Sequence, residues 1–269
     1  MTFLEKLAAA VHRNQSLVCV GLDPDPALMP AGIGVLEFNR AIIAATSDFA
    51  CAYKPNLAFY EALGIDGLVA LKDTLKSIPA HIPVIADAKR GDIGNTAKAY
   101  ARAVFEYYGF DACTVNPYLG SDAVEPFLQW RDKATFILCR TSNAGAADFQ
   151  SLRCETPKGT KHLYEIVAAT ANGWDQYGNV GLVVGATYPD ELKAVRQAYP
   201  DMPFLIPGIG AQGGDLTFTV NNGLDTKKEK TVINSSRQIL YASRGKDFAE
   251  AARKAAKTMR DQINAALAR

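Results

Sequence analysis

Short runs of apolar residues recur along the chain, and longer segments with apolar residues on one helical face separate them. The runs lie at 16–22, 50–53, 83–86, 112–115, 135–139, 180–184, 204–206 and 231–233. Because these runs are apolar throughout, they predict strands that are buried on both faces, as in a parallel sheet. The amphipathic segments predict helices at 2–14, 36–49, 61–77, 96–108, 122–130, 161–172, 189–199 and 247–267.

The order of these elements predicts the fold class. Strands that alternate with helices are typical of α/β proteins, and eight strand–helix units in about 250 residues favour a (β/α)8 TIM barrel. A doubly wound open sheet is the alternative. No linker or break in composition divides the chain, so we expect residues 1–269 to form a single domain.

Two stretches do not follow the alternation. Residues 144–160 are polar and irregular, and a stretch of that length predicts a functional loop. Residues 216–223 follow the seventh predicted strand but have no clear helical pattern.

The charge balance limits the possible partners. With a formal net charge of +1, the chain has neither the basic surface expected for nucleic-acid binding nor an acidic tail. Residues 1–7 are amphipathic with mixed charge and lack the pattern of a signal peptide. No apolar run reaches the roughly 18 residues of a membrane span. We therefore expect a cytoplasmic protein that binds neither nucleic acid nor membranes.

The cysteines and histidines indicate neither a disulfide framework nor a metal site. The five cysteines are far apart and the first four lie in apolar runs, which is typical of buried thiols in a reducing compartment. They are Cys19, Cys51, Cys113, Cys139 and Cys154. The isolated His12, His81 and His162 match no metal-ligand spacing, so we expect no bound metal.

The segment 85–96 carries a dense group of charges. An apolar strand leads into Asp87 and Lys89, which alternation along a strand places on the same side, and Asp92 follows the turn opened by Gly91. Charges at the end of a buried strand are costly to desolvate unless they pair with one another or with a ligand. The segment is therefore a candidate site, and a purely structural ion pair is the alternative.

Polar residues recur at the ends of the predicted strands, this one included. In a TIM barrel these carboxyl ends build the active site, so residues far apart in the sequence are expected to meet there. The set consists of Asp23, Lys54, Asp87, Lys89, Asn116, Ser142, Gln212 and Arg237. A single site explains this recurrence better than a separate structural reason at each strand end.

The last two strand ends have features of a phosphate site. Residues 208–215 contain G-x-G-x-x-G, but a dinucleotide fingerprint belongs near the start of a strand–helix–strand unit, with a clear helix after it. Backbone N–H groups that cradle a phosphate are the better interpretation. Residues 234–237 place backbone amides at a helix N-terminus, and the planar guanidinium of Arg237 suits phosphate oxygens.

With these residues in view, the sequence resembles the orotidine 5′-phosphate decarboxylase family. Five motifs carry the resemblance, in the right order and over nearly the whole chain. They are Gly21-Leu22-Asp23-Pro24, Tyr53-Lys54-Pro55-Asn56, Asp87-x-Lys89-x-x-Asp92, the glycine-rich 207–215 and Ser236-Arg237. The D-x-K-x-x-D motif alone is shared with sugar-phosphate enzymes on the same barrel. The spelling at 87–92 and 140–143 is similar to a longer, second bacterial subfamily, although Ala144 stands where we expect proline.

The resemblance implies a homodimeric barrel whose substrate is a small nucleotide. Lys54, Asp87, Lys89 and Asp92 would form the catalytic array of charges. Asp92, together with the substrate-binding Thr96, would reach into the site of the partner subunit.

The resemblance also implies which residues bind each part of the substrate. Asp23 would bind the ribose hydroxyls and Ser142 the pyrimidine, while Gln212 and Arg237 would hold the phosphate. The remaining residues of the implied substrate-binding set are Asn56, Asn116, Pro207 and Ser236.

The implied chemistry suits these residue types. Loss of CO2 from C6 of the substrate leaves a carbanion, which the ammonium of Lys89 can stabilise and then protonate, so no cofactor is needed. Asp87 would act near the substrate carboxylate, either by repulsion or by holding Lys89 in place. One rival hypothesis is a magnesium-dependent keto-sugar-phosphate decarboxylase or aldolase with aspartate ligands. The other is a barrel that binds a phosphorylated ligand without catalysis.

Overall fold

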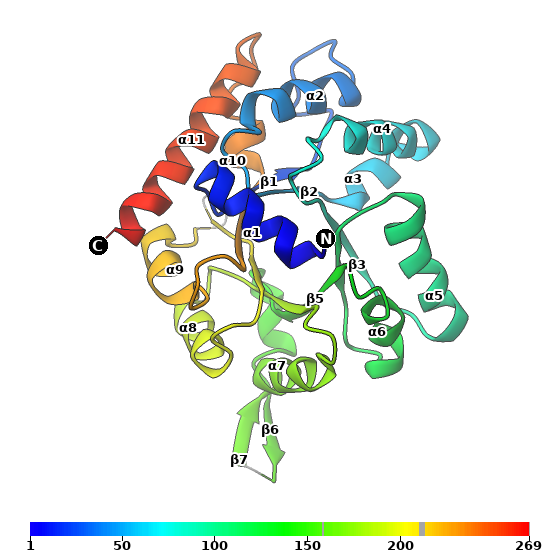
Figure 1. Ribbon diagram of the computed structural model, residues 1–269, viewed down its shortest axis with the longest axis vertical. Coiled ribbons are helices and arrows are strands. Elements are labelled where there is room, and N and C mark those ends of the chain that lie inside the picture. Colours follow the sequence, from blue (N-terminus) through cyan, green and yellow to red (C-terminus); the bar gives the residue numbers. More distant parts are fainter. Residues whose placement is uncertain (158, 210–212, 269) are drawn as a thin grey trace.

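Eight parallel strands form a closed barrel, as the sequence pattern predicts. This computed structural model describes residues 1–157, 159–209 and 213–268. The barrel strands are β1 (Val18–Leu22), β2 (Ala52–Pro55), β3 (Ile85–Arg90), β4 (Ala112–Val115), β5 (Ala134–Arg140), β8 (Val180–Val184), β9 (Phe204–Ile206) and β10 (Thr231–Ser235). Their order is β2-β1-β10-β9-β8-β5-β4-β3, and parallel bridges Tyr53–Val84 and Asn56–Asp87 join the two edges (Figure 1). The open sheet is therefore the wrong alternative.

Helices surround the barrel on its outer side (Figure 1). They are α2 (Val35–Thr46), α3 (Leu57–Glu61), α4 (Gly64–Ser77), α5 (Gly94–Arg102), α6 (Ser121–Leu128), α7 (Leu163–Trp174), α8 (Pro189–Ala198), α9 (Leu216–Gly223), α10 (Arg237–Leu240) and α11 (Phe248–Leu267). Their apolar faces pack on the strands in one continuous core. In α11 the buried face includes Ala252, Ala256, Met259 and Ile263, as its periodicity predicts.

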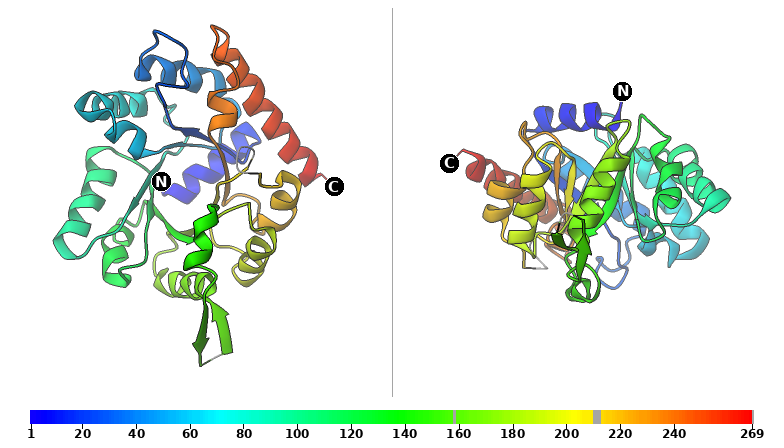
Figure 2. Two further views of the ribbon diagram at one scale, coloured as in Figure 1. Left: turned by 180° about the vertical axis from the view of Figure 1, so that it is seen from behind. Right: turned by 90° about the horizontal axis from the view of Figure 1, so that it is seen from below.

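One further helix, α1 (Phe3–Asn14), lies across the amino-terminal end of the barrel (Figure 2). The rings of Phe3 and Phe136 meet edge to face with centroids 5.7 Å apart. Lys6 Nζ donates to Asp111 Oδ2 at 2.8 Å, and that carboxylate also accepts from the backbone N–H of Val84. These contacts cover the amino-terminal end, and the carboxyl ends of the strands lie at the opposite end.

Two stretches are more regular than the sequence analysis suggests. Residues 216–223 form α9, because the carboxylate of Asp215 caps the helix by accepting from the N–H of Phe218 at 2.9 Å. The stretch 144–160 is not irregular. It contains the 3-10 turn η2 (Ala144–Asp148) and a protruding hairpin of β6 (Arg153–Thr156) and β7 (Gly159–His162).

Two predicted helices are interrupted. The segment 61–77 belongs to two helices, α3 and α4, because the chain adopts a φ of +65° at Gly64, a conformation that glycine allows at little cost. The segment 96–108 is α5, which starts at Gly94, followed by a π-helical turn, η1 (Ala103–Tyr107).

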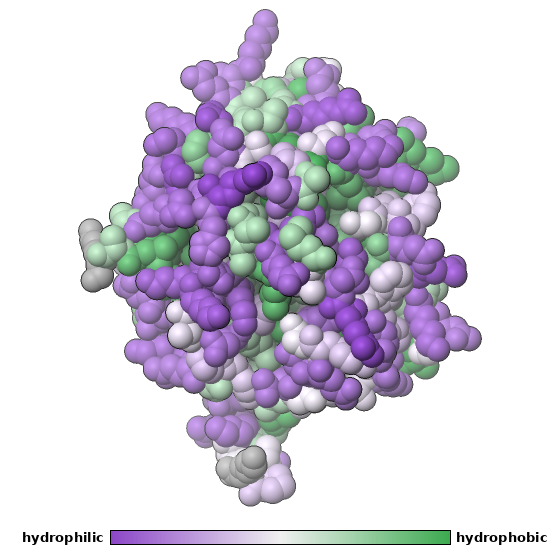
Figure 3. All heavy atoms as spheres, in the orientation of Figure 1, coloured by the Kyte–Doolittle hydropathy of each residue, from purple (hydrophilic) through white to green (hydrophobic). Residues whose placement is uncertain are grey.

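The surface on the α1 side is mainly hydrophilic (Figure 3). Within the described ranges, no helix combines the length and the apolar character needed to cross a bilayer. Large apolar side chains are exposed on α4, on α5 and η1, and in the segment after β4. They include Leu63, Ile65, Val69, Ile93, Tyr100, Tyr107, Tyr118 and Leu119.

Candidate active site

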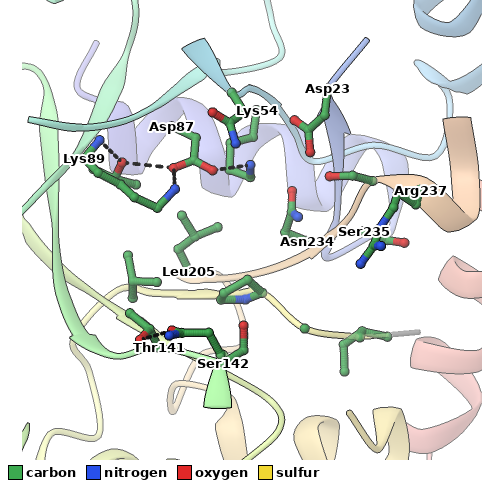
Figure 4. A pocket seen from close by; sticks show the side chains of 18 of the residues that line it. Asp23, Lys54, Asp87, Lys89, Thr141, Ser142, Leu205, Asn234, Ser235 and Arg237 are labelled. Atoms are coloured by element: carbon green, nitrogen blue, oxygen red, sulfur yellow. Dashed lines mark hydrogen bonds and ion pairs between the residues drawn. The ribbon is translucent and has the colours of Figure 1, made fainter. Parts of the chain in front are cut away.

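A polar cavity of about 550 Å³ opens at the carboxyl ends of the barrel strands (Figure 4). This size suits a small ligand such as a nucleotide. Most of the candidate residues line it, although they come from six different strand ends. They are Asp23, Lys54, Asn56, Asp87, Lys89, Ser142, Pro207, Ser236 and Arg237. The barrel therefore assembles the site that the strand ends predict.

Asp87 lies between two ammonium groups at the end of β3. Its Oδ2 accepts from Lys54 Nζ at 2.8 Å, and its Oδ1 from Lys89 Nζ at 2.5 Å. Burial by itself would raise the pKa of Asp87, but Lys54 and Lys89 outweigh burial and hold that pKa well below its usual range. Burial would likewise lower the pKa of Lys54, yet the carboxylates of Asp87 and Asp23 raise it. Asp87 and Lys54 therefore both stay charged at neutral pH.

Thr114 of β4 shapes the backbone that carries Lys89. The chain adopts a φ of +46° at Lys89, and the pairing of β3 with β4 shifts between Ala86 and Arg90. The hydroxyl of the buried Thr114 accepts from the N–H groups of Ala88 at 3.0 Å and Lys89 at 2.9 Å. It also contacts Asp87 Oδ1 at 3.2 Å as a donor. One hydroxyl thus stabilises an uncommon backbone conformation and the carboxylate beside it.

We expect Thr114→Val to lower kcat by about 10- to 100-fold with little change in KM, because the Lys89 ammonium loses its position without loss of a substrate contact. Steady-state kinetics with the nucleotide substrate that the sequence resemblance implies would measure both constants. Thr114→Ser keeps the hydroxyl and should restore most of the rate. Equal rates for the valine and serine variants would contradict the role of the hydroxyl.

Asp23 is held at the end of β1 by contacts of its backbone. Its carbonyl accepts from the Tyr241 hydroxyl at 2.7 Å, and that hydroxyl accepts from the N–H of Asp25 at 2.7 Å. Tyr241 follows α10, so this hydroxyl joins the first and last strand–helix connections of the barrel. The side chain of Asp23 is left to face the cavity (Figure 4).

The loop with Ser142 is fixed by side chains that come later in the chain. Gln150 Oε1 accepts from the N–H of Thr141 at 2.8 Å, and Gln150 Nε2 donates to the Thr141 hydroxyl at 2.8 Å. The Thr187 hydroxyl donates to the carbonyl of Ser142 at 3.1 Å. Buried Arg140 donates to Gln150 at 3.3 Å and forms an ion pair with Glu191, so it supports the loop from behind.

The candidate phosphate residues lie at the ends of β9 and β10. Pro207 follows β9 and lines the cavity with Gly208, which has a φ of +102°. Ser236 is the cap residue of the short helix α10, and the exposed Arg237 is its first residue. Gln212, the other predicted phosphate ligand, lies outside the described residues.

Three predicted site residues lie outside this chain's own cavity. Asp92 is in the segment between β3 and α5, where its Oδ1 accepts from the N–H of Ile93 at 2.8 Å. Thr96 is exposed on α5. Asn116 follows β4, and its Oδ1 accepts from the N–H of Tyr118 at 3.0 Å. The first two positions suit residues that serve another subunit, and the structure leaves the predicted role of Asn116 without a contact to the cavity.

Sequence reasoning missed several residues that shape the cavity, among them Thr114, Gln150 and Tyr241. Thr114 lies within a predicted strand, where a threonine is expected for its β propensity alone. Gln150 and Tyr241 act through backbone groups of distant segments, and no spacing in the sequence reveals such contacts. In the part of the chain that the structure describes, no group of three or more His, Cys, Asp and Glu side chains could hold a metal ion.

Proteins of similar sequence and structure are known. A model of the Orotidine 5′-phosphate decarboxylase / HUMPS family matches residues 16–255. The chain is 60% identical to the orotidine 5′-phosphate decarboxylase of Dehalococcoides mccartyi over 98% of both chains. Its structure is similar to that of Leishmania donovani OMP decarboxylase, with a TM-score of 0.87, 43% identity and 99% of both chains covered. Leishmania donovani UMP synthase matches with a TM-score of 0.88 and 45% identity, over 98% of this chain and 56% of that one.

The closed barrel and the charged cavity at its carboxyl end define the chain as a TIM-barrel enzyme. The sequence similarity extends over the strand ends that build this cavity. The chain belongs to the orotidine 5′-phosphate decarboxylase family, and it is a carboxy-lyase.

Proposed function

We propose that the chain catalyses the cofactor-independent decarboxylation of orotidine 5′-phosphate to uridine 5′-phosphate, a step of de novo pyrimidine biosynthesis. The observation that carries the proposal is the position of Asp87 between the ammonium groups of Lys54 and Lys89, at 2.8 and 2.5 Å. Relatives that bear the name of this enzyme along their whole length support the choice of substrate.

Lys89 is the proposed acid. As the bond between C6 and the carboxylate breaks, CO2 leaves and the electron pair stays on C6. Lys89 Nζ then gives a proton to C6, which forms the C6–H bond of the product, and the amine regains a proton from water. The positive charge beside C6 also stabilises the developing carbanion. The side chain of Lys89 is 50% exposed, so the ammonium is accessible to a ligand in the cavity.

Asp87 is proposed to hold Lys89 in place. Lys54 and Thr114 fix its carboxylate from the barrel side, and its remaining contact goes to Lys89. A carboxylate at this point also repels the carboxylate of the substrate, and loss of CO2 relieves that repulsion. The observed contacts favour positioning as the larger effect, because they orient the proton donor before the substrate binds.

The remainder of the cavity suits the other parts of the nucleotide. Asp23 and Asn56 flank Lys54 at the ends of β1 and β2, where we place the ribose. Ser142 lies across the cavity, where it can contact the pyrimidine (Figure 4). Ser236 and Arg237 lie where the phosphate is expected, and binding of the phosphate there contributes energy far from the reacting carbon.

We expect Arg237→Ala to weaken inhibition by uridine 5′-phosphate about 10- to 100-fold, because a charge-assisted hydrogen bond to the phosphate is lost. Inhibition constants for uridine 5′-phosphate and uridine would be compared. Inhibition by uridine, which has no phosphate, should not change. As a matched control, Arg253→Ala removes an exposed arginine of α11, which pairs with Asp48, and should leave both constants unchanged.

We also propose that the chain acts as a homodimer in which Asp92 and Thr96 complete the site of the partner. Both residues lie outside their own cavity, Asp92 on the segment that joins β3 to α5 and Thr96 in the first turn of α5. Exposed apolar side chains surround this segment in the chain, including Ile93, Tyr100 and Tyr107. Exposed apolar surface of this kind marks interfaces between subunits. A cytoplasmic location is proposed as well, since all five cysteines are free thiols.

The direct test is to follow the pyrimidine absorbance after adding orotidine 5′-phosphate to the purified chain in the presence of EDTA. We expect full conversion to uridine 5′-phosphate without added metal. Activity that EDTA abolishes and Mg²⁺ restores would favour the magnesium-dependent rival on the same barrel. Binding of the nucleotide without any turnover would favour a barrel that has lost catalysis.

A further inference from the structure

We propose that the side chain of Asn234, at the carboxyl end of β10, accepts a hydrogen bond from a ribose hydroxyl and makes the site selective for ribonucleotides. The inference rests on the proposed function, because it concerns the sugar of the same substrate. It assigns a specificity role to a residue whose backbone alone figures in the phosphate motif 234–237.

The first observation is an unpaired acceptor inside the cavity. Asn234 is 7% exposed, and its Oδ1 is buried without a hydrogen-bond partner among the described residues. Buried polar atoms almost always have a partner, so an unpaired one that faces a cavity indicates a ligand. Its side chain points into the cavity, toward the side chain of Asp23 (Figure 4).

The second observation is that Asp23 presents another unpaired acceptor beside it. Strands β1 and β10 are neighbours, with Cys19 opposite Asn234, so Asp23 and Asn234 project from adjacent strand ends. Asp23 Oδ1 is also buried and has no partner among the described residues. Two acceptors at adjacent strand ends need two donors from the ligand.

The chemistry of the ligand then follows from the parts of a nucleotide. A phosphate at neutral pH offers acceptors, which a carboxylate and an amide oxygen would repel. The vicinal hydroxyls of a ribose offer two O–H donors on adjacent carbons, one for each acceptor. We therefore assign one hydroxyl to Asp23 and the other to Asn234.

Gly21 provides the space for this arrangement. A Cβ at position 21 would lie 1.8 Å from Ser236 Oγ and 3.3 Å from Asn234 Oδ1. The side chains of Asn234 and Ser236 therefore cover the same bare stretch of β1, and one residue, Ser235, separates the sugar contact from the phosphate contact. This order, from the end of β10 to the cap of α10, matches the order of sugar and phosphate in the nucleotide.

The test measures, by calorimetry, the dissociation constants of the product and two of its analogues for the full chain and for the full chain with Asn234→Ala. The ligands are uridine 5′-phosphate, its 2′-deoxy analogue and its 3′-deoxy analogue. We expect the substitution to weaken uridine 5′-phosphate about 5- to 20-fold, as for the loss of one hydrogen bond. One of the two deoxy analogues lacks the hydroxyl that contacts Asn234, and it should bind the variant and the wild-type chain equally well. The affinity of the other analogue should fall as much as the affinity of uridine 5′-phosphate.

Two outcomes would overturn the inference. If Asn234→Ala lowers the affinity for all three ligands by the same factor, Asn234 contacts neither hydroxyl. If the substitution lowers the affinity for uridine 5′-phosphate but not for uridine, Asn234 contacts the phosphate instead.

Control measurements separate this result from folding and from the proposed function. Thr135→Val also removes a buried, unpaired polar atom, but from the start of β5 and away from the cavity, so the ligand ratios should not change. A melting curve would show that both variants are folded. Turnover of orotidine 5′-phosphate by the wild-type chain is measured separately. Its absence would reject the proposed function, whereas turnover without the expected pattern of binding would reject only the role of Asn234.

Discussion

Replacing Lys89 by alanine is expected to leave a folded protein that decarboxylates orotidine 5′-phosphate more slowly by a factor on the order of 10⁴ or more. The substitution removes the proton donor for C6 and the positive charge that stabilises the carbanion, and each effect alone is worth roughly 10²-fold or more. Uridine 5′-phosphate should still bind, because the proposed ribose and phosphate contacts remain. Single-turnover kinetics with a melting curve would measure both the rate and the fold.

The fold should tolerate this change because Lys89 is half exposed and Asp87 keeps its contact with Lys54. The matched control is Lys76→Ala, which removes an exposed lysine that pairs with Asp73 on the outside of the barrel. It should leave turnover unchanged. Turnover by Lys89→Ala close to that of the wild-type chain would contradict the assignment of Lys89 as the acid.

Mixing two inactive variants is expected to restore activity if the sites are shared between subunits. One chain carries Lys89→Ala and the other Asp92→Ala, and each is expected to be nearly inactive alone. In a symmetric dimer, random mixing makes half of the dimers mixed. In each mixed dimer, one of the two sites has an intact Lys89 from one chain and an intact Asp92 from the other. Co-refolding or co-expression should therefore recover about a quarter of the wild-type activity.

A second mixture provides the control. Chains with Lys89→Ala and with Asp87→Ala both lack a residue that serves its own cavity, so no mixed dimer contains an intact site and no activity should return. Failure of the Lys89 and Asp92 mixture to recover activity, although mixed dimers form, would place Asp92 in the site of its own subunit. Size-exclusion chromatography with two different tags would show that the dimers exchange.

The barrel fold was predictable because burial of a strand directly determines which residues the strand can contain. Strands buried on both faces must be apolar throughout, and the eight runs therefore appear in the sequence at nearly the positions of the eight barrel strands. The failures occur where a local contact overrides a weak pattern. Threonine, valine and asparagine give α9 little helix propensity, and the capping carboxylate of Asp215 compensates for it.

The charged array shows the limit of local reasoning more clearly. Regular alternation along a strand predicts that Asp87 and Lys89 share a side, and the two groups do meet. They meet, however, on a segment where the pairing shifts and Lys89 has a positive φ. The hydroxyl that stabilises this shape belongs to Thr114, which the chain brings there from the next strand. A sequence read in order does not contain that contact.

The helix that covers the amino-terminal end of the barrel has a practical consequence for how the chain can be extended. Met1 is exposed just before α1, at the end of the barrel away from the cavity (Figure 2). A tag or a second catalytic domain attached before Met1 would sit behind the barrel and leave the approach of nucleotides unobstructed. The same geometry favours attachment to a sensor surface through this end, with every site facing the solution.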